Sequence, residues 1–256
     1  MIKFTILGCG SSMGVPRADG NWGKCDPNEI KNFRTRCSAI IQTKKRNILI
    51  DTSPDLRFQF IKNKIENIDT VLYSHMHGDQ VHGINDLRIF SLKNSNKIPV
   101  YADKLTKKYL LKNFLYCFKD SRDYRAILSI NDLKKNYNLR DGKIKISIKS
   151  VPVKHGLIKS QSFIVNKSCA YISDANKIFE NDLKYFFNLK FLVIDCLRIK
   201  KHPSHFCLDE VIKLISVLKP KKAILTNMHS DLDYRYLIKI LPRNIIPAYD
   251  GISFNI

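Results

Sequence analysis

The feature that most constrains this chain is a cluster of imidazole and carboxylate side chains directly after an apolar segment. Residues 69–74, "DTVLYS", have the composition of a strand, and residues 75–79, "HMHGD", follow at once. His75 and His77 are two residues apart, so in extended chain they point to the same side. Asp79 stands two residues further on. Such donors at a strand end predict a metal site at the edge of a sheet.

The remaining histidines and one further aspartate occupy similar places. The chain has seven histidines, and the other five are His82, His155, His202, His205 and His229. None falls in the interior of a predicted helix or strand, and Asp174 follows the apolar "CAYIS" in the same way. Strand ends at one edge of a layered α/β protein share a face, where loops assemble a site. The pattern therefore predicts one site built from distant segments.

The order of apolar segments favours a layered α/β fold. Strand-like segments alternate with helical patterns along the chain. We expect a hairpin from residues 37–43 and 47–52, with "KKR" at its turn, and an amphipathic helix over residues 208–219. The last segment, residues 245–256, is expected to form a second hairpin. No repeat or linker is visible, so residues 1–256 are expected to form one domain.

Composition points to a cytoplasmic location. The seven cysteines form no C-x-x-C pair, which is typical of buried thiols in a reducing compartment. The first residues, "MIKFTILGCG", lack an extended apolar region with a cleavage site, and no apolar run is long enough to span a membrane. We therefore expect a cytoplasmic protein with no membrane partner.

The net charge of +21 favours an anionic partner. Lysines are spread along the whole chain, and no arginine-rich tract or aromatic-basic alternation marks a nucleic-acid groove. A small anionic substrate is therefore favoured over nucleic acid, which is not excluded. The sequence leaves the oligomeric state open, with a homodimer among the options.

The residues and motifs resemble the metallo-β-lactamase superfamily. More narrowly, the chain is similar to its PhnP-like branch, named for phosphoribosyl 1,2-cyclic phosphate phosphodiesterase and related to tRNase Z. The matching motifs include "LGCGSSMGVP", "RTRCSAII", "LIDTSPDLR", "YSHMHGDQVHGINDLR", "VKHG", "YISDANKI", "HPSHFCLDE" and "AILTNMHSDLDY". The resemblance implies an αββα sandwich with the metals at the edge of its two sheets.

The resemblance also implies a ligand set of one or two divalent ions, zinc or manganese. His75, His77 and His155 match the ligands of the first ion. Asp174 matches the aspartate that bridges the two ions, and Asp79 matches the aspartate of the second.

The implied reaction is hydrolysis of a small cyclic or nucleotide-like phosphodiester. Water activated by the metal site and oriented by Asp79 is expected to attack phosphorus. His205 matches the histidine that protonates the departing oxygen in this branch.

Two positions break the pattern, and both belong to the second ion. Gln80 and Asn227 stand where relatives place histidines. His229, two residues further on, can act as the missing terminal ligand, and the Gln80 carbonyl oxygen can act as a harder donor that favours manganese or magnesium over zinc. The other interpretation is a mononuclear or decayed enzyme.

Three alternatives to the phosphodiesterase remain open. A tRNA-processing nuclease is suggested by the relation to tRNase Z and by the charge, and it would show RNA affinity that falls steeply with salt. Hydrolysis of a thioester or lactone is a second, because one fold supports many reactions. A non-catalytic member that binds metal or ligand is the third, motivated by Gln80 and Asn227.

Overall fold

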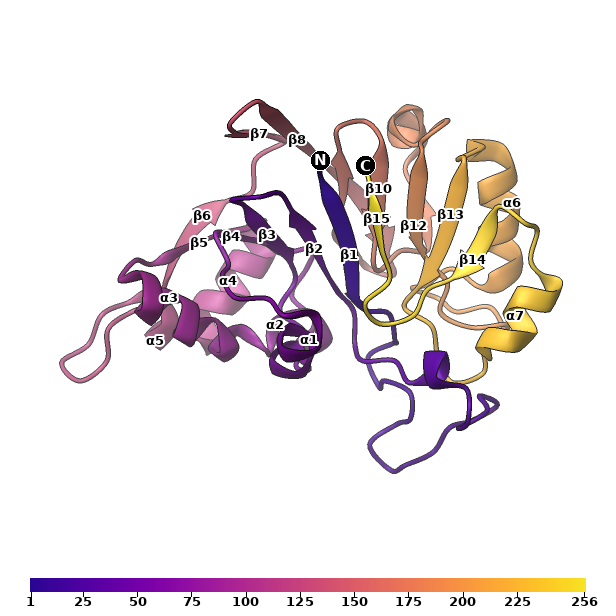
Figure 1. Cartoon of the computed structure of the whole chain (residues 1–256), viewed down its shortest axis with the longest axis horizontal. Helices are drawn as coiled ribbons and strands as arrows, with labels where there is room; N and C mark the ends of the chain where they lie inside the picture. Colours follow the sequence, from indigo (N-terminus) through magenta and orange to yellow (C-terminus); the bar gives the residue numbers. More distant parts are fainter.

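Two β-sheets pack face to face in the computed structural model, which describes residues 1–256, and helices cover the outer side of each sheet (Figure 1). This is the αββα sandwich expected from the sequence. The first sheet has the strand order β15-β1-β2-β3-β4-β5-β6. The second has the order β11-β8-β9-β10-β12-β13-β14, with β7 paired to β8.

The first half of the chain supplies most of the first sheet and its helices. Its strands are β1 (Lys3–Gly8), β2 (Ser38–Gln42), β3 (Asn47–Ile50), β4 (Thr70–Leu72), β5 (Ile98–Ala102) and β6 (Leu128–Asp132), joined by the C-terminal β15 (Ser253–Asn255). Its helices are α1 (Leu56–Asn63), α2 (Gly78–Val81), α3 (Arg88–Asn94), α4 (Lys104–Asn113) and α5 (Leu115–Phe118), with 3-10 helices η1 (Ile30–Asn32) and η2 (Ile84–Leu87).

The second half supplies the second sheet. Its strands are β7 (Asn136–Asp141), β8 (Ile144–His155), β9 (Ile158–Val165), β10 (Cys169–Ile172), β11 (Lys177–Ile178), β12 (Phe191–Asp195), β13 (Lys222–Thr226) and β14 (Ile245–Pro247). The helices are α6 (Leu208–Leu218), α7 (Tyr234–Ile240) and the 3-10 helix η3 (Glu180–Tyr185).

Alternating side chains of the central strands separate into two cores. In β2, Ala39 and Ile41 join the large core between the sheets, whereas Ile40 joins the smaller core beneath the helices. In β3, Ile50 and Leu49 divide in the same way. Successive side chains of a strand point to opposite faces, so a strand buried on both faces needs a continuous apolar run. This explains why these segments lack polar alternation.

Two predicted elements whose contacts lie between residues close in sequence were confirmed. β2 and β3 form the expected antiparallel hairpin. The expected helix over residues 208–219 is α6, whose apolar face is buried and whose residue Glu210 accepts a hydrogen bond from the Cys207 backbone N–H at its start.

The predicted C-terminal hairpin over residues 245–256 was wrong. β14 pairs in parallel with β13 of the second sheet, whereas β15 pairs with β1 of the first (Figure 1). The chain between them crosses from one sheet to the other, and the buried Asp250 accepts hydrogen bonds there from the backbone N–H groups of Cys9 and Thr35. Two neighbouring apolar segments look like a hairpin locally, but their partners lie more than twenty residues away or at the other terminus.

Parallel pairing brings most of the site-bearing strand ends together, and only β8, which carries His155, pairs antiparallel with all its neighbours. β3 to β6 run parallel in the first sheet, and β10, β12, β13 and β14 run parallel in the second. Carboxyl ends of parallel strands lie at one edge, where loops carry functional side chains. No helix of this structure is long and apolar enough to cross a membrane. The single domain over residues 1–256 stays a prediction.

Candidate metal centre

Three histidine nitrogens converge on one point at the edge of the sheets. His75 and His77 follow β4, and His155 ends β8. His75 Nε2 lies 3.0 Å from His77 Nδ1, which lies 3.2 Å from His155 Nε2. Tetrahedral ligands about 2.0–2.1 Å from a zinc ion are about 3.3 Å from one another. The three side chains therefore have the spacing of a metal's ligands, and their role as ligands stays a prediction.

Neighbouring groups orient these rings for coordination. His155 Nδ1 donates to the Ser204 carbonyl oxygen at 2.7 Å, and His75 Nδ1 lies 3.0 Å from Ser74 Oγ. Such contacts fix the tautomer and leave Nε2 free to bind a metal. Burial lowers the pKa of His75 to about 3 and also lowers the pKa values of His77 and His155. The rings are therefore neutral, which is the form that binds metal.

Asp51 supports the histidine segment from behind. Its Oδ1 accepts a hydrogen bond from the Ser74 backbone N–H at 2.7 Å, directly before His75. Asp51 is fully buried and has positive φ of 61°. The end of β3 is thereby tied to the end of β4.

Two carboxylates, Asp79 and Asp174, lie beside the histidines, and each accepts a hydrogen bond from a side-chain amide. Gln80 Nε2 donates to Asp79 Oδ2 and to Asp174 Oδ2, both at 3.1 Å. Asn227 Nδ2 lies 3.2 Å from Asp174 Oδ1. Burial, together with the neighbouring charge of Asp174, raises the pKa of Asp79 to about 6. The structure thus brings both predicted aspartates to the site.

His205 is held by a carboxylate that sequence reasoning missed. Its Nδ1 donates to Asp195 Oδ2 at 2.7 Å. Burial lowers the pKa of His205, but the charge and hydrogen bond of Asp195 outweigh it and raise that pKa to about 9. At neutral pH the ring is therefore an imidazolium. Asp195 ends β12 just as Asp174 follows β10, so its strand-end position was an available signal.

A cavity of about 230 Å³ opens beside these groups. It is lined by Ser11, Ser12, Met13, His77, Asp79, His155, Asp174, Leu197, Arg198, His202, Ser204, His205, Asn227 and His229. The glycine-rich N-terminal segment thus forms one wall through its serines. Its Gly10 approaches backbone so closely that an added Cβ would lie 2.8 Å from the Arg34 carbonyl oxygen.

His229 lines this cavity but does not join the ligand clusters. Groups whose ligand atoms lie within 4.8 Å of one another are His75, His77 and His155, and His155, Asp174 and His205. His229 Nδ1 instead lies 3.5 Å from Asp231 Oδ1. Its role as a metal ligand stays a prediction that needs movement of the ring.

Three other residues of interest lie outside the ligand set. His82 Nε2 lies 3.0 Å from Tyr109 Oη at the surface. Arg36 forms a two-point ion pair with Asp55, and the Arg88 guanidinium lies 4.2 Å from the centre of the Tyr124 ring. Both arginines are therefore engaged in contacts within the protein, Arg36 with a carboxylate and Arg88 with an aromatic ring.

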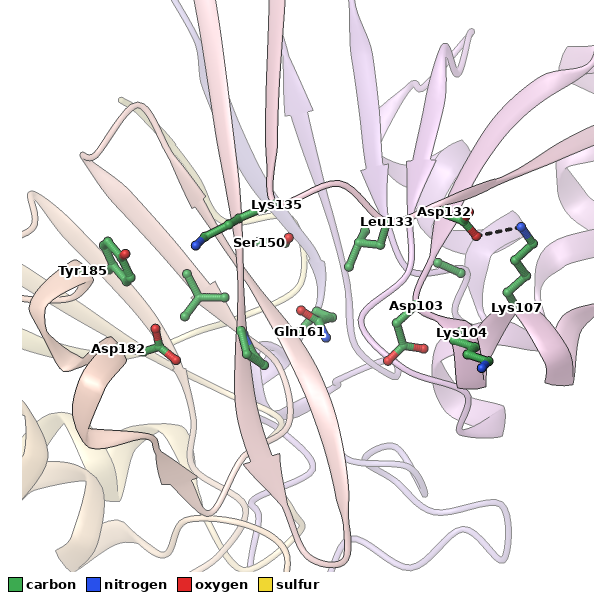
Figure 2. A pocket seen from close by; sticks show the side chains of 13 residues that line it. Asp103, Lys104, Lys107, Asp132, Leu133, Lys135, Ser150, Gln161, Asp182 and Tyr185 are labelled. Atoms are coloured by element: carbon green, nitrogen blue, oxygen red, sulfur yellow. Dashed lines mark hydrogen bonds and ion pairs between the residues drawn. The ribbon is translucent and has the colours of Figure 1, made fainter.

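A larger cavity of about 790 Å³ lies elsewhere and has no such chemistry. Figure 2 shows its side chains spread around a wide opening, with Lys107 paired to Asp132 on one side and Asp182 on the other. No histidine or cysteine lines it. The candidate metal centre is therefore in the smaller cavity.

Comparison with known sequences finds one family model and two relatives. The model of the β-lactamase superfamily domain matches residues 46–228. An octanoyltransferase of Porphyromonas gingivalis is 28% identical over 259 residues, which cover 98% of this chain and 51% of that protein. A ribonuclease Z of Clostridium kluyveri is 27% identical over 100 residues, covering 38% of this chain and 27% of that protein. The chain thus spans about half or less of these relatives.

Solved structures are similar over the whole chain. A new diphosphatase from the PhnP family has a TM-score of 0.90 with 28% identity, covering 100% of this chain and 98% of that one. Zn²⁺-bound PqqB from Methylobacterium extorquens has a TM-score of 0.78 at 16% identity, covering 99% and 100%. The short form of human tRNase Z has a TM-score of 0.70 at 16% identity, covering 99% and 98%. The last two show a shared fold.

Proposed function

The chain belongs to the β-lactamase superfamily and is a hydrolase of the metallo-β-lactamase fold, and on that premise we propose that it is a metal-dependent phosphodiesterase for small substrates. The observation that carries the proposal is that neutral histidines and a protonated histidine lie at the same cavity. Three neutral imidazoles form a ligand set, and the imidazolium of His205 lines the same space.

The chemistry divides between the ligand set and its neighbours. A divalent ion held by His75, His77 and His155 would supply a Lewis acid and a water of lowered pKa. Asp79 orients the attacking water and accepts its proton. His205, kept protonated by Asp195, gives a proton to the departing oxygen.

Cavity size and charge support a small anionic substrate. A volume of about 230 Å³ is below the range usual for drug-sized ligands, and Arg198 adds a positive charge to its wall. The similar diphosphatase also supports phosphate chemistry. A diphosphate is therefore tested beside the diesters.

The test joins metal content to turnover on one sample. Protein purified without chelators is analysed for metal and assayed with bis-p-nitrophenyl phosphate, cyclic nucleotides and a dinucleoside diphosphate. We expect bound zinc or manganese and turnover of at least one compound, both lost in His75→Ala. Bound metal without turnover of any of them would contradict the proposal.

Acyl transfer or thioester hydrolysis is a second candidate because of one comparison. The octanoyltransferase of P. gingivalis aligns with 98% of this chain, although the chain spans only about half of that protein. The same sample is therefore assayed with an octanoyl thioester. Thioester turnover without phosphodiester turnover would favour this candidate.

The nuclease alternative has weaker support. The ribonuclease Z match covers 38% of this chain. A cytoplasmic location, a homodimer and the choice between zinc and manganese stay predictions from the sequence.

A further inference from the structure

We infer that this chain holds a single ion, at the three histidines, and that the side-chain amides of Gln80 and Asn227 take the place of a second one. The inference deepens the proposed function and rests on it only for the ion at His75, His77 and His155. It concerns the space between Asp79 and Asp174, where the resemblance implies a second ion.

Gln80 uses both of its amide hydrogens on the two carboxylates. Its Nε2 lies 3.1 Å from Asp79 Oδ2 and 3.1 Å from Asp174 Oδ2. A side-chain amide has two N–H donors, so the nitrogen is saturated and bridges the acids. A metal ion between two carboxylates does the same with its charge. The side chain is fully buried on the short helix α2, so it has no solvent alternative.

Asn227 also donates both of its amide hydrogens to carboxylates, one of them to the other oxygen of Asp174. Its Nδ2 lies 3.2 Å from Asp174 Oδ1 and 3.2 Å from Asp195 Oδ1. The nitrogen of His205 that also lies 3.2 Å away donates to Asp195, so it cannot accept from the amide. Both amide hydrogens therefore go to carboxylates, and each oxygen of Asp174 accepts one amide.

A cation between Asp79 and Asp174 would meet, besides the two carboxylates, only the N–H donors of Gln80 and Asn227 where relatives supply histidines. Binding would require both amides to turn over, which removes the four hydrogen bonds that hold Asp79, Asp174 and Asp195. Turning would bring the two amide oxygens against the acids, and of these Gln80 Oε1 is buried without a partner. His229 does not compensate, because its ring is placed against Asp231.

The experiment counts ions in the protein and in a variant with the two missing histidines. Metal-free wild type, Gln80→His/Asn227→His and the control Gln42→His/Asn188→His are dialysed against excess Zn²⁺ and analysed for metal. The control adds two histidines away from the site, one at Asn188, which has the same left-handed backbone as Asn227. We expect about one ion per chain in wild type and control, and about two in the site variant.

Two results would overturn the inference. The first is two ions per wild-type chain, and the second is a folded site variant that still holds one. Absorption of Co²⁺ added to wild type gives an independent reading, with the expected break at about one equivalent, so the question is decided even if the variant unfolds. If the wild-type protein bound one ion but turned over no substrate, the proposed function would be contradicted. The inference about the number of ions would still stand.

Discussion

Residues of the same type in the candidate centre differ in charge because their surroundings differ. Burial with no acid in hydrogen-bond contact lowers the pKa of His75 to about 3. His205 is also buried, but its hydrogen bond to Asp195 raises its pKa to about 9. One ring can therefore bind a metal while the other can donate a proton at the same pH.

Replacing His205 should affect substrates according to their leaving group. We expect His205→Asn to lower kcat by about 100-fold or more for a diester with an alkoxide leaving group, because general-acid catalysis contributes roughly 10²–10⁴-fold. The effect should be much smaller for bis-p-nitrophenyl phosphate, because p-nitrophenolate departs without a proton. Steady-state kinetics with both substrates measure the difference.

His202→Asn is the matched control for this experiment. His202 lines the same cavity, but its Nδ1 contacts only Ser204 of its own loop. We expect it to change both rates by less than about tenfold, below the general-acid range. Equal losses for the two leaving groups in His205→Asn would contradict the assigned role.

Helix α1 is tied to a distant part of the chain by a few polar contacts. Asp55, directly before α1, accepts hydrogen bonds from the Arg36 backbone N–H at 2.8 Å and from Arg36 Nη2 at 2.6 Å. These contacts join the start of α1 to the chain that leads into β2. The ion pair is only partly exposed, so water screens it less than a surface pair.

The ion pair of Asp55 should make stability depend on pH. Burial raises the pKa of Asp55, but the hydrogen bonds from Arg36 outweigh it and hold that pKa below its usual value. A depressed carboxyl pKa stabilises the fold above the unfolded value of about 3.9 and loses this effect as pH falls through the folded value. We expect Asp55→Asn to lower the free energy of unfolding by about 1 kcal/mol at pH 7, after allowing for screening.

Urea denaturation at pH 7 and near the folded pKa measures this change. The difference between wild type and Asp55→Asn should shrink as pH drops below about 4. Asp19→Asn, which breaks a more exposed pair with Arg17, should change the unfolding free energy by less than about 0.5 kcal/mol. A difference that persisted at acid pH would show that the pair is not its source.

The turn between α2 and η2 requires glycine at position 83. An added Cβ on Gly83 would lie 1.9 Å from the Ser53 carbonyl oxygen, whereas one on Gly78 would meet only the His82 ring at 3.3 Å. We expect Gly83→Ala to destabilise by about 2 kcal/mol and lower the Tm by roughly 5 °C. Gly78→Ala should leave the Tm within about 2 °C, and equal Tm values for the two variants would refute the packing argument.

On the scale of the whole molecule, the net charge of +21 acts at long range. The wall of the candidate centre's cavity includes Arg198 and the imidazolium of His205. A field of this sign raises the local concentration of an anionic substrate and its rate of association.

Ionic strength should therefore change kcat/KM and leave kcat unchanged. We expect kcat/KM for an anionic diester to fall several-fold between about 50 and about 500 mM NaCl, because salt screens charges beyond a few ångströms. A neutral p-nitrophenyl ester, if turned over, is the control and should not respond. An unchanged kcat/KM for the diester would mean that the net charge does not guide it to the site.

Helices and strands could be predicted where the residues that contact one another are close in the sequence. The hairpin of β2 and β3 and the helix α6 follow from apolar patterns within about fifteen residues. The final hairpin could not, because β14 and β15 satisfy their backbone groups on different sheets. Strand identity is a local property, whereas the choice of partner depends on which edges remain free.

By itself, the sequence determined that imidazoles and carboxylates stand at strand ends, and it predicted which of them form a ligand set. His75, His77 and His155 are two to about eighty residues apart, yet they meet at one edge. β4 is a parallel strand, and β8, separated from β10 by the antiparallel β9, runs in the same direction as β10. Only the tertiary structure placed Asp195 against His205 and the amides of Gln80 and Asn227 between the carboxylates. The reason is physical: hydrogen bonds act over about 3 Å, and such distances between distant segments are decided by packing.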